Sequence, residues 1–196
     1  MKLANKSIGF AVTGSHCTLE RVVPVCRELV EQGVEIYPIL SDSVLQDTRF
    51  GSAQKWIKLF KDITNNPLID SIVKAEPIGP QKMIDLLIIA PCTGNTMAKI
   101  ANGVIDSTVV MAAKAQLRNQ RPVLISIATN DGLGLNARNL SILLNTKNIF
   151  FVPFGQDNPE AKPNSLISRI DLLPEAVPKA LEFKQLQPVL IEYRGI

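Results

Sequence analysis

The sequence predicts a three-layer α/β fold built around a doubly wound, mostly parallel sheet. Apolar, strand-like runs alternate along the chain with segments of helical periodicity. Several of these runs end in short turns of Gly, Ser, Thr and Asn, as strand-to-helix turns at the carboxyl edge of such a sheet do. The chain has 196 residues, 46% of them hydrophobic. We therefore expect a single Rossmann-like or flavodoxin-like domain over 1–196, with a flap and a tail from about 155.

The first half of the chain supplies two clear strands and two clear helices. In order, we expect a strand at 7–13, a helix over 19–30, a strand at 34–40 and a helix around 56–63. Gly33 stands where a helix usually ends, and Pro24 should kink the helix that contains it. From 67 to 84 the pattern is weaker, and we expect a short strand at 71–73 and a rigid loop at 76–80.

The second half begins with a nearly continuous apolar run, typical of a central strand that is covered on both faces. The expected core elements are a strand at 85–90, helices at 94–102 and 107–117, a strand at 122–128, a helix at 135–146 and a strand at 149–153. The polar, proline-bearing segment 155–165 predicts a loop or flap. The tail should contain a helical segment at 166–183, broken near Pro174 and Pro178, and a terminal arm at 189–191.

Composition excludes several classes of function. The net charge is only +3 and the basic residues are scattered, which argues against nucleic acid as a partner. No apolar run approaches the roughly 18 residues that a membrane span requires, and no signal segment is evident, so we expect no membrane association. Three unpaired cysteines, Cys17, Cys26 and Cys92, fit a reducing, cytoplasmic environment. One histidine and no Cys-x-x-Cys pattern predict that there is no metal site.

Four polar turns carry the chemistry that the sequence offers. They are Thr13-Gly14-Ser15-His16-Cys17, Ser41-Asp42-Ser43, Pro91-Cys92-Thr93-Gly94-Asn95-Thr96 and Thr129-Asn130-Asp131-Gly132. Hydroxyls, backbone N–H groups and the start of a helix suit a phosphate, although each turn alone is equally consistent with a capped helix that binds no ligand. The dinucleotide and Walker fingerprints are absent, so a mononucleotide such as flavin mononucleotide (FMN) fits better than NAD or ATP.

Individual side chains near these turns have candidate roles. His16 is the candidate proton donor or acceptor, the alternative being a polar residue at a helix start. Cys17 and Cys92 are expected to be small buried residues, and Met97 and Met111 to lie in the core. Five cations are candidates for binding a dicarboxylate: Arg49, Lys114, Arg118, Lys162 and Arg169.

The first and third turns, together with Ala98-Lys99-Ile100-Ala101-Asn102-Gly103, resemble the signature segments of a flavin-binding superfamily. That superfamily includes peptidyl-cysteine decarboxylases, phosphopantothenoylcysteine decarboxylase and flavin prenyltransferase. The resemblance implies bound FMN, with Phe50 beside the flavin ring. The implied cofactor-binding residues are Thr13, Gly14, Ser15, His16, Ser41, Ser43, Phe50, Thr93, Gly94, Asn95, Thr96, Thr129 and Asn130.

Further segments resemble one branch of that superfamily, the flavoprotein chains of dipicolinate synthases. They include Asp47-Thr48-Arg49-Phe50-Gly51, Met111-Ala112-Ala113-Lys114-Ala115, Phe154-Gly155-Gln156-Asp157 and Lys162-Pro163-Asn164-Ser165. This resemblance implies one chain of an oxidoreductase that helps to oxidise dihydrodipicolinate, a small dicarboxylate, to dipicolinate during sporulation. It also implies a partner, the A subunit of dipicolinate synthase, which binds NAD or NADP, and it implies a homo-oligomer.

The chain departs from the decarboxylases, because they carry a catalytic histidine after the second strand and this chain has none there. A prenyltransferase or decarboxylase-like enzyme, or a non-catalytic nucleotide-binding partner, remains the alternative.

Overall fold

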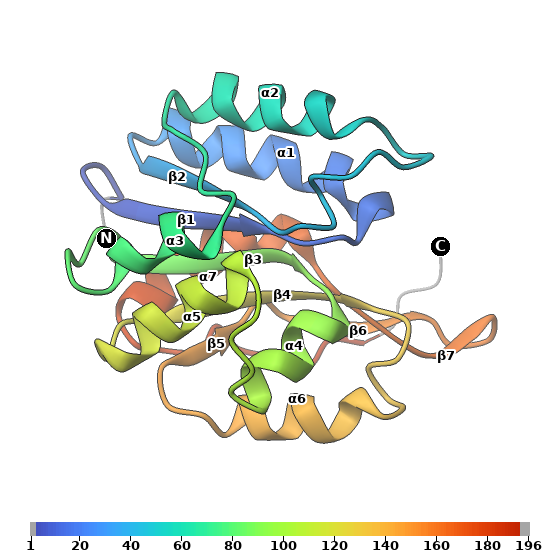
Figure 1. Cartoon of the computed structure of the whole chain (residues 1–196). Helices are drawn as coiled ribbons and strands as arrows, with labels where there is room; N and C mark the ends of the chain where they lie inside the picture. The colour runs from blue at the N-terminus through green and yellow to red at the C-terminus, as the bar shows by residue number, and fades with distance from the viewer. Residues whose placement is uncertain (1–2, 193–196) are drawn as a thin grey trace.

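Seven strands form one mixed sheet in the order β2-β1-β3-β4-β7-β6, with β5 also paired to β4 (Figure 1). The computed structural model describes residues 3–192, so 1–2 and 193–196 of the predicted domain lie outside it. The strands are β1 (Ser7–Val12), β2 (Glu35–Leu40), β3 (Leu86–Cys92), β4 (Val123–Thr129), β5 (Ile149–Phe151), β6 (Phe154–Asn158) and β7 (Lys162–Ser168). The first five pair in parallel, whereas β7 is antiparallel to both β4 and β6.

Helices cover both faces of the sheet, which confirms the three-layer α/β prediction (Figure 1). They are α1 (His16–Glu31), α2 (Ala53–Thr64), α3 (Ile72–Ala75), α4 (Gly94–Ala101), α5 (Thr108–Arg118), α6 (Asn136–Leu144) and α7 (Leu173–Leu181), with short 3₁₀ turns η1 (Glu76–Ile78) and η2 (Ile170–Leu172). Apolar side chains of α1, α2 and α7 form one core, and those of α3, α4, α5 and α6 form the other. All seven residues of β3 are buried between the two cores, as its apolar sequence predicts.

Helix α3 begins at Ile72 and Ser71 is its N-cap, so the short strand predicted at 71–73 is wrong. The Ser71 side chain accepts a hydrogen bond from the backbone N–H of Lys74, which caps α3 at its first turn. The rigid loop predicted at 76–80 includes the 3₁₀ turn η1. The apolar pattern at 72–73 suggested a strand, whereas the Ser71 side chain starts a helix at this point.

Prolines interrupt fewer helices than the sequence suggests. Pro24 lies inside α1, which runs from His16 to Glu31 without a break. Pro178 likewise lies inside α7, and Pro174 occupies its first turn, where a missing N–H costs little. The predicted break near Pro178 is therefore wrong, and the helical segment predicted from 166 begins only at Leu173, after β7 and η2.

The segment 155–165 belongs to the β6–β7 hairpin, so the predicted loop there is wrong. Ala128 and Thr129 at the end of β4 pair with Ile167 and Leu166 of β7, and this pairing extends the sheet. The arm predicted at 189–191 is confirmed, because Phe154 N–H donates to the Val189 carbonyl and Ile191 N–H donates to the Phe154 carbonyl. The arm thereby covers part of the outer edge of β6.

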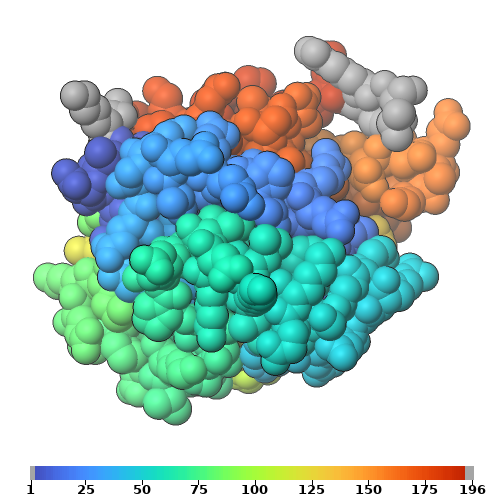
Figure 2. All heavy atoms as spheres, turned by 90° about the horizontal axis from the view of Figure 1, so that it is seen from above, coloured from blue at the N-terminus to red at the C-terminus, as the bar shows by residue number. Residues whose placement is uncertain are grey.

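The carboxyl ends of the parallel strands face one end of the molecule. In Figure 1 the loop after β2, the starts of α1 and α4 and the β6–β7 hairpin all lie at this end. Figure 2 shows two of these segments from above, the loop after β2 in cyan and the hairpin in orange. No helix within residues 3–192 is long and apolar enough to cross a membrane.

Candidate functional site

The four polar turns contact one another in the order of their strands. Thr13 of the first turn donates its hydroxyl hydrogen to the Pro91 carbonyl at 2.7 Å and accepts from the Thr93 N–H at 3.0 Å. A Cβ atom on Gly14 would lie 2.6 Å from Ser43 Oγ, and one on Gly94 would lie 2.6 Å from Thr129 Oγ1. The turns after β2, β1, β3 and β4 therefore form one continuous polar surface, as the sequence predicts.

Thr13 joins two of these turns. Its side chain is 1% exposed, and both of its hydrogen bonds run to the turn after β3. A buried hydroxyl that makes two such bonds fixes the relative position of the segments it connects.

The start of α1 is open to an anion. Ser15 is the N-cap residue, but its side chain makes no capping hydrogen bond and instead lies 3.0 Å from Thr18 Oγ1. At the start of α4, by contrast, Thr93 accepts a hydrogen bond from the Thr96 N–H at 3.3 Å. Because the first N–H groups of a helix lack intrahelical partners, the uncapped start of α1 is the better place for a phosphate.

The turn after β2 adds two hydroxyls beside Gly14. Ser41 Oγ and Ser43 Oγ lie 2.9 Å apart, with Ser41 buried and Ser43 exposed. Because Gly14 has no side chain, Ser43 approaches its backbone closely. This turn and the start of α1 can therefore contact the same ligand group.

A chain of side-chain amides supports the turns after β3 and β4. Asn136 donates to Asp131 Oδ2 at 3.2 Å, and Asn139 donates to Asn136 Oδ1 at 3.0 Å. Asn102 at the end of α4 donates to Asn139 Oδ1 at 3.0 Å. A Cβ on Gly94 would lie 2.7 Å from Asn136 Nδ2, so Asn136 packs directly against the turn after β3. The sequence pattern did not single out this residue. Its position at the start of α6 was the available signal.

The β6–β7 hairpin closes a small cavity of about 110 Å³ beside these turns. Ser15 and Thr18 line it from α1, Asn130 from the turn after β4, and Lys162 and Ser165 from the hairpin. Ser165 Oγ donates to the Thr129 carbonyl at 3.2 Å, which ties the hairpin to that turn. Sequence reasoning missed two of these residues: Ser165, which only the hairpin pairing brings to the site, and Thr18, which lies on α1 with its hydroxyl 3.0 Å from Ser15 Oγ.

His16 and Phe50 lie together at the edge of the site. Their rings are parallel within 3°, with centroids 6.4 Å apart, and Phe50 is 39% exposed. His16 Nδ1 is buried without a hydrogen-bond partner. The Arg49 guanidinium lies 4.8 Å above the Phe50 ring. A buried ring nitrogen without a partner is the kind of group that a ligand satisfies.

Some of the remaining candidate residues lie at the site, and the others lie away from it. Asn95 is exposed at the start of α4, and Thr96 is buried with its hydroxyl 3.1 Å from Thr93 Oγ1. Arg169 is paired with Asp171 at 2.6 Å, and this pairing holds the pKa of the Asp171 carboxyl below its usual value. Arg118 lies against Gly79, before β3 begins, and Lys114 is exposed on α5. Of the five candidate cations, Arg49 and Lys162 contact the site described above.

The cysteines and methionines follow the core prediction with one exception. Cys17 is exposed, so its predicted burial is wrong; it stands in the first turn of α1, where the helix faces the cavity. Cys92 is buried, and burial raises the pKa of its thiol to about 12. Met97 is fully buried and Met111 partly buried.

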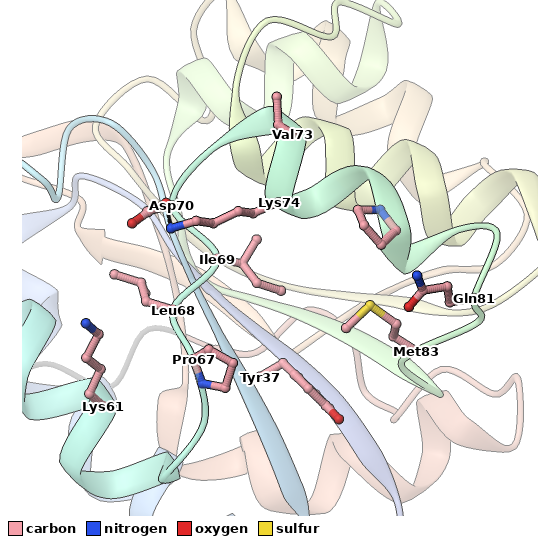
Figure 3. A pocket seen from close by; sticks show the side chains of 11 residues that line it. Tyr37, Lys61, Pro67, Leu68, Ile69, Asp70, Val73, Lys74, Gln81 and Met83 are labelled. Atoms are coloured by element: carbon pink, nitrogen blue, oxygen red, sulfur yellow. Dashed lines mark hydrogen bonds and ion pairs between the residues drawn. The ribbon is translucent and has the colours of Figure 1, made fainter.

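A larger cavity of about 610 Å³ lies elsewhere, beside the outer edge of β2 (Figure 3). Tyr37, Ile69 and Met83 form much of its apolar lining, and Lys74 at its rim is paired with Asp70 at 2.7 Å. None of the site residues predicted from the sequence lines it. Size alone therefore does not locate the polar site, which lies at the carboxyl edge.

The model of the flavoprotein family matches residues 1–169. The chain therefore belongs to the flavoprotein family, as the turn motifs predict.

Two relatives are similar over the whole chain. The B subunit of dipicolinate synthase from Bacillus subtilis strain 168 is 54% identical over 195 residues, which cover 98% of each chain. The crystal structure of the dipicolinate synthase B subunit from Bacillus halodurans superposes with a TM-score of 0.91 at 51% identity, covering 99% of this chain and 100% of the other. These similarities confirm the resemblance to the dipicolinate synthase branch.

A more distant structure shares the fold. Burkholderia xenovorans DmrB in complex with FMN, described as a cubic protein cage for redox transfer, has a TM-score of 0.68 at 17% identity. The similarity covers 91% of this chain and 96% of that one. At this identity the comparison supports the three-layer architecture.

Proposed function

We propose that this chain is the flavin-binding B subunit of a dipicolinate synthase and binds FMN at the four connected turns. The observation that carries the proposal is the pair of Thr13 hydrogen bonds, which place the uncapped start of α1 beside the turn after β3. The family match and the similarity to two dipicolinate synthase B subunits support the same assignment.

The residues present fit FMN by their chemistry. The N–H groups at the start of α1, with Ser15, Ser41 and Ser43, would hold the phosphate. Gly14 and Gly94 let Ser43 and Thr129 pack closely against the backbone of these turns. Polar groups for the ribityl chain would come from Thr93, Asn95, Thr96, Thr129 and Asn130. Phe50 offers an apolar ring face to the flavin ring. The His16 Nδ1 atom, which lacks a partner, is the candidate site for holding a proton.

In this proposal the bound flavin supplies a two-electron acceptor. The reaction removes two hydrogens from dihydrodipicolinate and gives the aromatic dicarboxylate dipicolinate. Both relatives are named as the B component of their enzyme, which supports a partner, the A subunit; we propose that this partner binds NAD or NADP. A homo-oligomer in the cytoplasm completes the proposal, and the cage named for DmrB supports self-assembly in this fold.

A cysteine decarboxylase or prenyltransferase is the alternative activity. His16 is the single histidine, and it lies at the start of α1 and not after β2. The decarboxylase base therefore has no counterpart at its usual place. Turnover of a cysteine peptide or a prenyl phosphate by the isolated chain would favour this alternative.

Titration with FMN, followed by visible absorbance and flavin fluorescence, tests the proposal. We expect uptake of FMN by the purified protein and at least about tenfold weaker binding by Ser15→Asp, because a carboxylate at the start of α1 repels the phosphate. Aspartate is itself a good N-cap, so the variant should fold. Ser71→Asp at the start of α3 is the matched control and should bind FMN normally. Absence of FMN uptake by the unsubstituted protein would contradict the proposal.

Complex activity separates a catalytic role from a purely structural one. In the assembled two-component enzyme, His16→Ala should lower dihydrodipicolinate oxidation while leaving assembly intact. Unchanged activity of both His16→Ala and Asn95→Ala would instead indicate a non-catalytic nucleotide-binding partner.

A further inference from the structure

We propose that Arg49 is the residue that binds a carboxylate of the substrate, and that the tight turn around it makes the site selective for a planar ring acid. This inference rests on the proposed function and adds to it a substrate-binding residue. It draws on the geometry of residues 47–56, which none of the four polar turns includes.

The turn that carries Arg49 is closed on both sides. Thr48 N–H donates to the Gly51 carbonyl at 3.0 Å, and Gly51 N–H donates to the Thr48 carbonyl at 3.1 Å. The Phe50 N–H donates to Thr48 Oγ1 at 3.2 Å. Gly51 has φ +143°, a conformation that glycine adopts easily and other residues rarely do. Arg49 and Phe50 are thus the two central residues of a doubly hydrogen-bonded turn.

This turn is fixed to the rest of the fold at several points. Asp47 Oδ1 accepts a hydrogen bond from the Ala53 N–H at 2.8 Å, just after the turn. The Phe50 ring lies parallel to the His16 ring on α1, and one turn further along that helix Glu20 pairs with Lys55 at 3.2 Å. The turn is therefore held against the first two turns of α1, beside the proposed phosphate site.

Arg49 combines an oriented guanidinium with an uncompensated charge. Its guanidinium lies over the Phe50 ring, which favours one orientation of the planar N–H groups. Within residues 3–192 it forms no ion pair, whereas Lys162 is paired with Asp157 and Arg169 with Asp171. A planar guanidinium without an acidic partner is suited to bind a carboxylate through two parallel hydrogen bonds.

The shape of the surroundings suits a flat ligand. Phe50 and His16 present parallel rings next to Arg49, and His16 Nδ1 has no partner. A planar ring that bears carboxylates can contact these aromatic edges while one carboxylate binds Arg49. The substrate and product of the proposed reaction both belong to this chemical class.

Direct binding of pyridine-2,6-dicarboxylate to the FMN-loaded protein, measured by isothermal titration calorimetry, tests the proposal. We expect Arg49→Gln to weaken binding about 10- to 100-fold, as the loss of a charged hydrogen-bond pair does. Arg49→Lys should restore only part of the affinity, because an ammonium cannot bind in the bidentate manner. Arg138→Gln removes an arginine on α6, away from this turn, and should change nothing. Equal affinity in Arg49→Gln and the unsubstituted protein would overturn the proposal.

A second measurement distinguishes a carboxylate from the flavin phosphate as the group that Arg49 binds. FMN and riboflavin are titrated into the protein and into Arg49→Gln; we expect the variant to bind both flavins normally. Weaker FMN binding with unchanged riboflavin binding would assign Arg49 to the phosphate and overturn the proposal. The same dicarboxylate titration of flavin-free protein separates the two hypotheses. Failure to take up any flavin contradicts the proposed function, whereas dicarboxylate binding to the flavin-free protein that depends on Arg49 still supports this inference.

Discussion

Thr13 shows how a single buried hydroxyl organises the candidate site. Its hydrogen bonds to Pro91 and Thr93 connect residues that are 78 and 80 positions apart in the sequence. The hydroxyl is enclosed, so water cannot replace either bond. The position of Ser15 relative to Thr93 therefore depends on this one side chain.

Thr13→Val is expected to weaken both folding and flavin binding. Valine fills the same space but leaves the Thr93 N–H and the Pro91 carbonyl without their partner, which should lower the free energy of unfolding by about 1–3 kcal/mol. Urea denaturation and FMN titration measure the two effects. Thr13→Ser keeps the hydroxyl and should retain most of the FMN affinity. A valine variant that matches the unsubstituted protein in both measurements would show that Thr13 does not join the turns.

At the residue scale, sequence predicted the composition of the site better than its contacts. Gly14 and Thr93 stand out because a polar turn follows an apolar run, and local sequence shows that. The contact of Gly94 with Asn136 and the stacking of His16 on Phe50 depend on tertiary packing. The burial of Cys17 was predicted wrongly, because local sequence does not show that the first turn of α1 faces a cavity.

At the element scale, the apolar strands of the parallel part of the sheet were predictable, and the polar hairpin that extends the sheet was not. The apolar run of β3 identifies a central strand without any knowledge of its neighbours. The β6–β7 hairpin is polar and contains Pro159 and Pro163, so no alternating pattern marks it as a strand pair. Its extended conformation comes from pairing with β4 and from the arm at 189–191.

Protection of the β2 edge also depends on elements far apart in sequence. Pro38 has no N–H to offer, and its carbonyl accepts a hydrogen bond from the Ile69 N–H at 2.9 Å. The Ile36 carbonyl accepts from Asn66 Nδ2 at 2.9 Å. The segment 66–69 thus occupies an edge that would otherwise be free to pair with another chain.

Ser168 anchors the hairpin, and its replacement should loosen that element selectively. Ser168 Oγ accepts from the Ile127 N–H at 2.7 Å and donates to the Val152 carbonyl at 3.3 Å, both in buried surroundings. Ser168→Ala leaves these groups unpaired and should destabilise the protein by about 1–3 kcal/mol. Hydrogen exchange should show the largest loss of protection in β6 and β7.

Ser141→Ala provides the matched control for this prediction. Ser141 Oγ donates to the Ala137 carbonyl on the exposed side of α6, so its loss should change stability by no more than about 0.5 kcal/mol. A similar effect of both substitutions would contradict the anchoring role of Ser168.

On the scale of the whole molecule, the sheet separates two apolar cores, and each contains one buried thiol. Cys26 on α1 belongs to the core under α1, α2 and α7, and Cys92 on β3 belongs to the core under α3 to α6. Burial raises the pKa of both thiols from their usual value of 9.0 to about 12. Each thiol should therefore ionise readily only when the helical layer that covers it opens. Ionisation of Cys26 and of Cys92 thus indicates separately whether each of the two cores is intact.

This arrangement predicts that stability falls in alkaline solution. Between pH 9 and about 12 the unfolded chain loses protons that the folded chain keeps, so each thiol should lower the free energy of unfolding by about 1.4 kcal/mol per pH unit. The contribution is fully present below pH 9. Urea denaturation at pH 8 and pH 10.5 measures the change, and Cys26→Ala/Cys92→Ala should show a smaller loss over this interval. Cys17→Ala is the matched control, because Cys17 is exposed.

Thiol reactivity gives an independent measurement of the same packing. In native protein at pH 8, Ellman's reagent should label Cys17 rapidly, whereas Cys26 and Cys92 should react only after denaturation. Rapid labelling of Cys26 would indicate opening of the layer formed by α1, α2 and α7, and rapid labelling of Cys92 would indicate opening of the opposite layer. Because the two thiols lie on different sides of the sheet, simultaneous exposure during mild denaturation is the expected sign that both layers unfold as one cooperative unit.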